Sequence, residues 1–485
     1  MNSLRATNNP LKFALINPPY PVPFIREGRC QLSQKIRKNS IPQMTLAYMA
    51  SGLSKGGYKV KVWDCIAENI SVDALNEKLY EWKPNFIFLN TSTPTFSYDV
   101  KTAEEIKKKI PKVFLIAFGV HVSVSPNEII KDNPAIDAVI SGEPEVVAFK
   151  IADEASAGTK NFTDIPGLAT KSQSIKKNPS IFCDNLDSLG IPAWEFLPIK
   201  YYIHPVFNKP YLIINTSRGC PQRCIFCVGH IFYGYKVRYR SVESIIEEIK
   251  LNIEKFDVRH FWFYADDFTY NPGFVKELCR GIIKDRLNIT WWSNTRVDCL
   301  DREMFNLMAE AGCSMLSIGG ESGDEDMLNR MRKRTTPDQI TQTVKLLRES
   351  KIISLVYFIF GLPGETKKSI TNTIKFAIQL NPDFVEFYPA IPFPGTEFYC
   401  IAIKENMITV DSYDYFHNDG KNAVVKVNDL YPKDINSAIG KAYRRFYFRP
   451  MYLFTLFKNF PRLRFLSRLM SFGISYFKIL AREKG

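Results

Sequence analysis

RGCPQRCIFC, at residues 218–227, places three cysteines in the pattern C-x-x-x-C-x-x-C and follows directly on the apolar segment YLIIN at 211–215. Three thiolates on one loop can hold three irons of a cubane cluster and leave the fourth iron open to a small molecule. A structural cluster normally uses four cysteines, so the absence of a fourth is the informative feature. The pattern therefore predicts a 4Fe–4S cluster bound by Cys220, Cys224 and Cys227.

A zinc site formed by the three cysteines and His230 is the main alternative. Structural zinc loops usually pair two C-x-x-C units in small domains, whereas this loop follows the first strand of a long alternating series. Three inert, buried cysteines are a weaker alternative, because Arg218, Gln222 and Arg223 lie among them in the sequence.

From residue 205 to about residue 400, apolar segments alternate with amphipathic ones. Six such β/α units predict an open, partial (β/α)6 barrel of the TIM type, in which chemistry sits at the carboxyl ends of the strands. The expected strands lie at 211–215, 260–264, 290–294, 315–318, 354–360 and 384–389. The expected helices lie at 241–256, 272–286, 301–311, 337–350 and 367–380.

A second alternating series occupies residues 10–150, so the fold class is α/β throughout. Its apolar strands and crossover helices predict a Rossmann-like parallel sheet that is covered on both faces. Residues 151–204 are interpreted as a linker, and residues 401–485 as a C-terminal region with a short helical tail. The expected strands are 13–17, 59–63, 86–90, 113–118 and 138–140, with helices at 43–53, 71–82 and 97–109.

The composition of the 485 residues is that of a globular protein, with 45% hydrophobic and 24% charged residues. We find no secretion signal and no run of about 18 apolar residues, so we expect a cytoplasmic protein. Ten cysteines in such a chain argue against disulfides. The formal charge of +14 is concentrated in residues 441–485, which carry eleven Lys and Arg and one Glu.

Residues 205–400 resemble the radical S-adenosylmethionine (SAM) superfamily. The resemblance rests on the cysteine triad together with DD at 266–267, RVD at 296–298, GGESG at 319–323, MRKRTT at 331–336, GLPGET at 361–366 and PFPGT at 392–396. It implies that SAM chelates the open iron and that one electron from the cluster cleaves SAM into a 5′-deoxyadenosyl radical. It also implies that Phe226 packs near the adenine.

Polar residues after the barrel strands can be given roles on this resemblance. Glu321 is expected to accept hydrogen bonds from the ribose or amino group of SAM, and Arg296 to pair with its carboxylate. Asp266 and Asp267 could accept from the amino group or from the substrate. For each acid the alternative is an exposed loop carboxylate, and for each glycine a plain turn residue. The further cofactor-binding positions are Gly319, Gly320 and Ser322.

The first domain resembles the cobalamin-binding domain that precedes many radical SAM enzymes, through INPPYP at 16–21, TSTPTF at 91–96, FGVHVSVSPNE at 118–128 and SGEPE at 141–145. It lacks the D-x-H-x-x-G stretch by which some such domains ligate cobalt. His121 could be a lower ligand of cobalt, a partner of a corrin amide or a structural histidine. The other expected cobalamin-binding residues are Ser92, Thr93, Thr95, Gly119, Gly142 and Glu143.

The C-terminal tail interleaves aromatic and basic residues. A basic, apolar helix in residues 451–485 would suit peripheral contact with an anionic membrane on its inner, cytoplasmic face. The alternative is a helical cap docked on the barrel, which the RRFYFRP stretch, similar to a tail common in this family, favours for its own part. No nucleic acid partner is expected, since no recognised module is present.

Together these resemblances imply a cobalamin-dependent methyltransferase that acts on an unactivated carbon of a small-molecule or lipid-like substrate. The implied reaction needs a one-electron donor such as flavodoxin or ferredoxin. One SAM would give the radical that abstracts a substrate hydrogen, and a second SAM would remethylate cobalt. An oxidative cyclase or rearrangement enzyme is the alternative within the family, and a non-catalytic cobalamin or cluster sensor is the alternative outside the enzymes.

Overall fold

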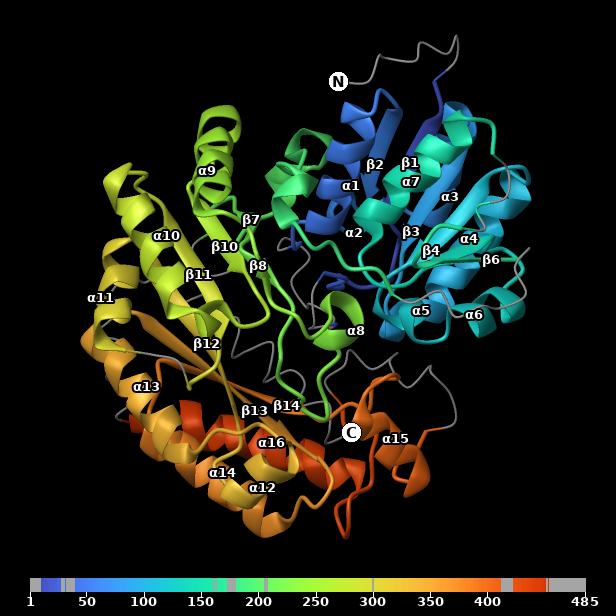
Figure 1. Ribbon diagram of the computed structural model, residues 1–485. Helices are drawn as coiled ribbons and strands as arrows, with labels where there is room; N and C mark the ends of the chain where they lie inside the picture. The colour runs from blue at the N-terminus through green and yellow to red at the C-terminus, as the bar shows by residue number, and fades with distance from the viewer. Residues whose placement is uncertain are drawn as a thin grey trace.

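A computed structural model describes the fold for residues 10–27, 31, 40–159, 162, 164–171, 180–204, 208–298, 301–410, 422–450 and 452. Two six-stranded sheets organise the described chain, with the helix α8, Gly229–Tyr233, between them (Figure 1). The strands expected from the sequence are confirmed, and their ends lie within three residues of those expected.

The first sheet has the order β2-β1-β3-β4-β5-β6, with β1 to β5 parallel. Apolar side chains on both faces of its strands pack into two separate cores, one under α1 and α7 and the other under α3 and α4. The expected parallel sheet covered on both faces is thus confirmed. Its strands are β1 Lys12–Asn17, β2 Lys59–Asp64, β3 Phe86–Asn90, β4 Phe114–Phe118, β5 Ala138–Ile140 and β6 Leu168–Thr170. Its helices are α1 Met44–Lys55, α2 Cys65–Glu68, α3 Val72–Trp82, α4 Phe96–Lys109, α5 Val120–Val124, α6 Pro126–Asp132 and α7 Pro144–Ser156, with a 3-10 turn at Thr93–Thr95.

The expected linker at 151–204 contains more structure than the sequence indicated. The strand β6 pairs antiparallel with β5, so the first sheet continues beyond the expected boundary at residue 150. A strand of three residues is too short to show an alternating pattern, which explains why it was missed. Short 3-10 helices follow at Leu186–Leu189, Trp194–Phe196 and Ile199–Tyr201, and Trp194 is fully buried.

The second sheet has the order β14-β13-β12-β11-β10-β7, and all its neighbouring strands are parallel. Because β7 and β14 form its two ends in the described chain, the six β/α units make an open sheet, as expected. Its strands are β7 Leu212–Asn215, β10 His260–Tyr264, β11 Thr290–Thr295, β12 Cys313–Glu321, β13 Ile353–Phe360 and β14 Phe384–Pro389. A two-residue ribbon, β8 Ser217–Arg218 with β9 Arg238–Tyr239, closes the base of the cysteine loop.

Five helices return the chain between strands of this sheet, and each begins with a polar cap. The N-cap side chain accepts a hydrogen bond from the backbone N–H three residues later, which satisfies an otherwise unpaired donor. These caps are Ser241, Asn271, Asp301, Thr336 and Thr366. The helices are α9 Val242–Phe256, α10 Pro272–Lys284, α11 Arg302–Glu310, α13 Pro337–Glu349 and α14 Lys367–Leu380. The shorter elements of this domain include the 3-10 turn Phe268–Tyr270, α12 Glu325–Arg330 and, after β14, α15 Glu397–Lys404.

The helix α16, Pro432–Tyr447, covers the outer edge of β14. The hydroxyls of Tyr443 and Tyr447 accept hydrogen bonds from the N–H groups of Phe387 (3.0 Å) and Val385 (3.1 Å). These contacts satisfy an edge strand that would otherwise be open to another chain. The docked alternative therefore holds for the start of the tail, while the expected membrane-binding part, apart from one residue, lies outside the described residues. No helix in the described ranges has the length and hydropathy of a membrane span.

Candidate active site

The three cysteines lie on the loop between β8 and α8, and all three are half-buried and outside any disulfide. Backbone hydrogen bonds fix this loop to the barrel: Ile225 N–H donates to Met331 O (3.1 Å), and Phe398 N–H donates to Ile225 O (2.9 Å). The N–H of Gly229 points to Cys227 Sγ at 3.4 Å. The loop thus presents its sulfur atoms at the carboxyl ends of the strands, as the sequence predicted.

A buried ion pair lies beside Cys224. The ammonium of Lys333 donates to Glu321 Oε1 at 2.7 Å, and both side chains are more than nine-tenths buried. Burial raises the pKa of the Cys224 thiol, while the positive charges of Lys333 and Arg296 lower it. Lys333 lies in the MRKRTT motif but was given no role from the sequence, because its partner is known only from the fold.

The end of β12 is shaped for this ion pair. Its register against β13 shifts between Gly319 and Glu321, and Glu321 has a left-handed φ of 59°. A Cβ on Gly319 would lie 2.4 Å from Glu321 Oε1 and 2.6 Å from Lys333 Nζ, so glycine leaves the room that the pair needs. A Cβ on Gly320 would meet Val356 Cγ1 at 2.7 Å. The close approaches at the two glycines are therefore made by protein atoms.

Arg296 and the two aspartates are buried, which rules out exposed loop carboxylates. Arg296 donates to Asp298 Oδ2 (2.9 Å) and to Lys333 O (2.6 Å). Asp266 Oδ2 accepts from Gly219 N–H at 2.8 Å and so anchors the cysteine loop. Asp267 accepts from the Arg296 N–H at 3.3 Å, and burial raises the pKa of its carboxyl.

Two other expected SAM-binding residues lie nearby. The Ser322 hydroxyl is 2.9 Å from Thr373 Oγ1 and accepts from Asp324 N–H, so it is used within the protein. Phe226, before the last cysteine, is partly buried against the barrel core.

In the first domain, two of the hydroxyls expected to face a corrin, those of Ser92 and Thr95, belong to an internal network. Thr95 Oγ1 donates to Asp99 Oδ2 (2.6 Å) and lies 2.7 Å from Ser92 Oγ. Arg26, which forms a fully buried ion pair with Asp99, also donates to Thr95. Thr93 is buried at the same edge and binds Gln31 through its backbone N–H.

His121 lies on α5 with its ring centroid 4.3 Å from that of Phe96. Burial lowers its pKa to about 4, so the imidazole is neutral at neutral pH. The two glycines at this edge allow close contacts with backbone atoms of neighbouring segments. A Cβ on Gly119 would lie 2.1 Å from Thr91 O, and one on Gly142 would lie 2.5 Å from Ile181 O.

Glu143, which was expected to bind cobalamin, has its carboxylate in a buried ion cluster. Its side chain is 1% exposed, and its carboxylate lies 2.7 Å from Arg238 Nη2 and 3.2 Å from Arg218 Nη1. The same Arg218 donates to Glu145 Oε1 at 2.8 Å. Because Arg218 and Arg238 pair across the β8–β9 ribbon, the base of the cysteine loop is joined to the first domain by buried charges.

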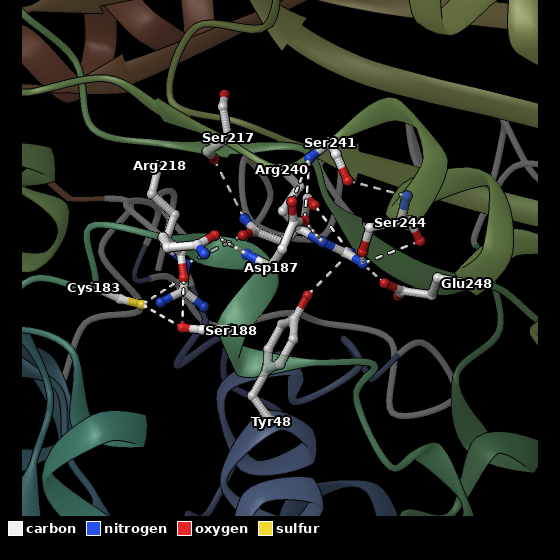
Figure 2. Close-up of polar contacts among 12 residues, drawn as sticks. Tyr48, Cys183, Asp187, Ser188, Ser217, Arg218, Arg240, Ser241, Ser244 and Glu248 are labelled. Atoms are coloured by element: carbon white, nitrogen blue, oxygen red, sulfur yellow. Dashed lines mark hydrogen bonds and ion pairs between the residues drawn. The ribbon is translucent and has the colours of Figure 1, made fainter.

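A second polar cluster lies beside this contact (Figure 2). The Tyr48 hydroxyl of α1 accepts a hydrogen bond from Arg240 at 3.2 Å, and Arg240 also pairs with the buried Glu248 of α9. Asp187 accepts from the N–H of Ser241 at the start of α9. The first domain, the linker and the barrel therefore share one buried polar interface.

Comparison with known proteins finds a match for each of the two domains. The Radical SAM superfamily profile matches residues 214–377, and the B12 binding domain profile matches residues 37–150. An uncharacterised methyltransferase of Pyrococcus horikoshii is 31% identical over 416 residues, which cover 85% of this chain and 89% of that protein. The anaerobic magnesium-protoporphyrin IX monomethyl ester cyclase of Rubrivivax gelatinosus is 27% identical over 85% of this chain and 75% of its own length. The methyltransferase TsrM of Kitasatospora setae, solved with tryptophan and a SAM analogue, superposes with a TM-score of 0.70 at 16% identity over 91% of this chain and 90% of its own.

Arg218→Met should destabilise the protein strongly, because it removes the Arg218 ion pair of the buried Glu145 and leaves the buried Glu143 with Arg238 alone. Breaking a buried pair in this way costs about 3–5 kcal/mol. We expect the midpoint of urea unfolding, measured by circular dichroism, to fall by a large amount. The matched control is Arg280→Met, whose exposed pair with Glu303 contributes at most about 1 kcal/mol. Equal midpoints for the two variants would contradict this account of the interface.

Proposed function

This chain belongs to the radical SAM superfamily, in the class that carries a B12-binding domain, and from this premise we propose that it methylates an unactivated carbon of a small, largely apolar molecule. When bound, the 4Fe–4S cluster and SAM supply the radical and cobalamin supplies the methyl group. The protein's task is to hold these groups in register and to exclude water.

The observation that carries the proposal is the buried Lys333–Glu321 pair beside the half-buried thiol of Cys224. A cubane cluster needs thiolates, and the amino acid part of SAM needs an acceptor for its ammonium and a donor for its carboxylate. The donor set at the barrel edge fits both requirements. Cys220, Cys224 and Cys227 would hold the cluster.

Glu321 would accept from the SAM amino group, and Lys333 with Arg296 would hold its carboxylate. Asp266 keeps the cysteine loop in place through Gly219. Phe226 would pack near the adenine. These assignments follow from charge and burial, because a buried cation and a buried anion can bind a zwitterion at little further desolvation cost.

For cobalamin, Thr93 and the neutral imidazole of His121 are the candidate contacts at the carboxyl edge of the first sheet. A neutral imidazole can act as a cobalt ligand or as a partner of a corrin amide. Ser92 and Thr95 would act indirectly, by holding the loop after β3 through Asp99.

Oxidative cyclisation is the second candidate, and the 27% identity to a magnesium-protoporphyrin IX monomethyl ester cyclase favours it. The two reactions differ in whether a methyl group reaches the product. Both need an electron, for which we expect a donor such as flavodoxin or ferredoxin. Contact of the tail with an anionic membrane also stays a prediction.

Anaerobic reconstitution with iron, sulfide and hydroxocobalamin should give a protein that releases 5′-deoxyadenosine from SAM on reduction by dithionite. Cys224→Ala should lose both the brown cluster absorbance and this product, because two thiols cannot hold the cluster. Cys400→Ala, which removes an exposed thiol elsewhere, should keep both. A Cys224→Ala protein that still cleaves SAM would refute the proposal. With SAM that is labelled in its methyl group, methyl transfer should give a labelled product, whereas cyclisation should give an unlabelled one.

Lys333→Met should weaken SAM binding to the reconstituted protein by at least about tenfold, since a hydrogen bond to a charged group contributes about 1.5–3 kcal/mol. Equilibrium dialysis measures it, with exposed Lys345→Met as the control. The double variant Lys333→Met/Glu321→Gln removes both charges and leaves none unpaired. If affinity returned in the double variant, Lys333 would serve only to neutralise Glu321.

A further inference from the structure

The two faces of the barrel sheet differ in exposure. On β13, the residues that face the helices are almost fully buried: Ser354 is 2% exposed, Val356 and Phe358 are 0% and Phe360 is 1%. The residues between them are all half-buried. The same alternation continues on β14, where Val385 and Phe387 are buried. The inner face is therefore partly exposed, whereas the helix face is buried.

One row of the inner face lies directly below the Lys333–Glu321 pair. Gly319 pairs in register with Tyr357, and Tyr357 pairs with Glu386 on β14. Since a Cβ on Gly319 would lie only 2.6 Å from Lys333 Nζ, this row begins under the proposed SAM site. Two strand spacings of about 4.8 Å place Glu386 roughly 10 Å across the sheet from Gly319.

Glu386 is half-buried among tyrosines. It accepts a hydrogen bond from the Tyr388 hydroxyl, and the Tyr388 ring centroid lies 6.0 Å from that of Tyr357. Burial and the neighbouring Glu386 raise the pKa of Tyr388 well above its ordinary value, so the phenol remains a donor. Apart from Glu321 at the irregular end of β12, Glu386 is the only carboxylate among the inner-face positions that the register of the described strands defines, and none of these positions has Lys or Arg.

We propose that Glu386, with Tyr357 and Tyr388, binds a basic nitrogen of the substrate and that the substrate is an apolar, ring-bearing amine. A carboxylate and tyrosine faces together attract an ammonium group through charge and cation–π contacts. The aromatic and aliphatic inner face, with Trp262, Leu355 and Ile359, would hold the apolar body. This assignment rests on the proposed function, because it uses the SAM site to define the reactive end.

The experiment uses the reconstituted holoenzyme with two probes of the same ring system and opposite charge, naphthylethylamine and naphthylpropionate. Titration calorimetry under nitrogen should show that the wild type binds the amine at least tenfold more tightly than the acid. Glu386→Gln should weaken amine binding by about tenfold and leave the acid unchanged or bound more tightly. Tyr388→Phe keeps the charge, so it should weaken amine binding by a smaller factor.

Glu247→Gln is the matched control, since it makes the same change at an exposed position of α9 in the same domain. It should bind both probes like the wild type. Equal affinity of the amine for wild type and Glu386→Gln, or no preference of the wild type for the amine, would overturn the inference. Each protein is also assayed for 5′-deoxyadenosine. If none forms in the wild type, the proposed function fails, whereas a normal yield with no charge preference refutes the amine site alone.

Discussion

Arg218 is fully buried, and its guanidinium lies between Glu143 and Glu145 of the other domain. Burying this charge without its partners would cost several kcal/mol, about the price of a broken buried ion pair. Separating the two domains at this contact would therefore raise the free energy of the protein strongly. Cys220 follows Arg218 by two residues, and Arg238 binds the same Glu143 from the far side of the loop. The position of the three thiols relative to the first domain thus depends on this ion cluster.

This ion cluster joins the edge of the first sheet at which cobalamin is expected to the edge of the second sheet at which the 4Fe–4S cluster is expected. Glu143 ends the loop after β5 and Glu145 lies in the first turn of α7, at the same edge of the first sheet as Thr93 and His121. Arg218 and Asp266 hold the base of the cysteine loop at the carboxyl edge of the second sheet. Methyl transfer from one cofactor to a radical made at another needs reacting groups within a few ångströms, and a rigid buried contact provides that constraint better than a flexible linker.

Local patterns predicted the parallel strands, half of the α-helices in the described chain and the position of the cysteine loop, because apolar alternation and loop spacing are properties of short segments. The roles of Glu143 and Lys333 could not be predicted in this way. Glu143 meets Arg238 across 95 residues, and the Lys333–Glu321 pair lies where the register of β12 against β13 shifts. Strand β6 was missed for a related reason, since only its pairing with β5 identifies so short a segment as a strand.

The helices also restrict where a substrate can bind. They bury one face of the second sheet completely, and α16 covers the edge of β14 through Tyr443 and Tyr447. What remains is the inner face, which begins below Lys333 at Gly319 and continues across Tyr357 to Glu386. A substrate held by its nitrogen at Glu386 would extend toward the cysteine loop, with its reacting carbon away from the anchoring charge. Recognition and chemistry would then use opposite ends of one row of residues, so the ammonium group would not compete with SAM for Glu321.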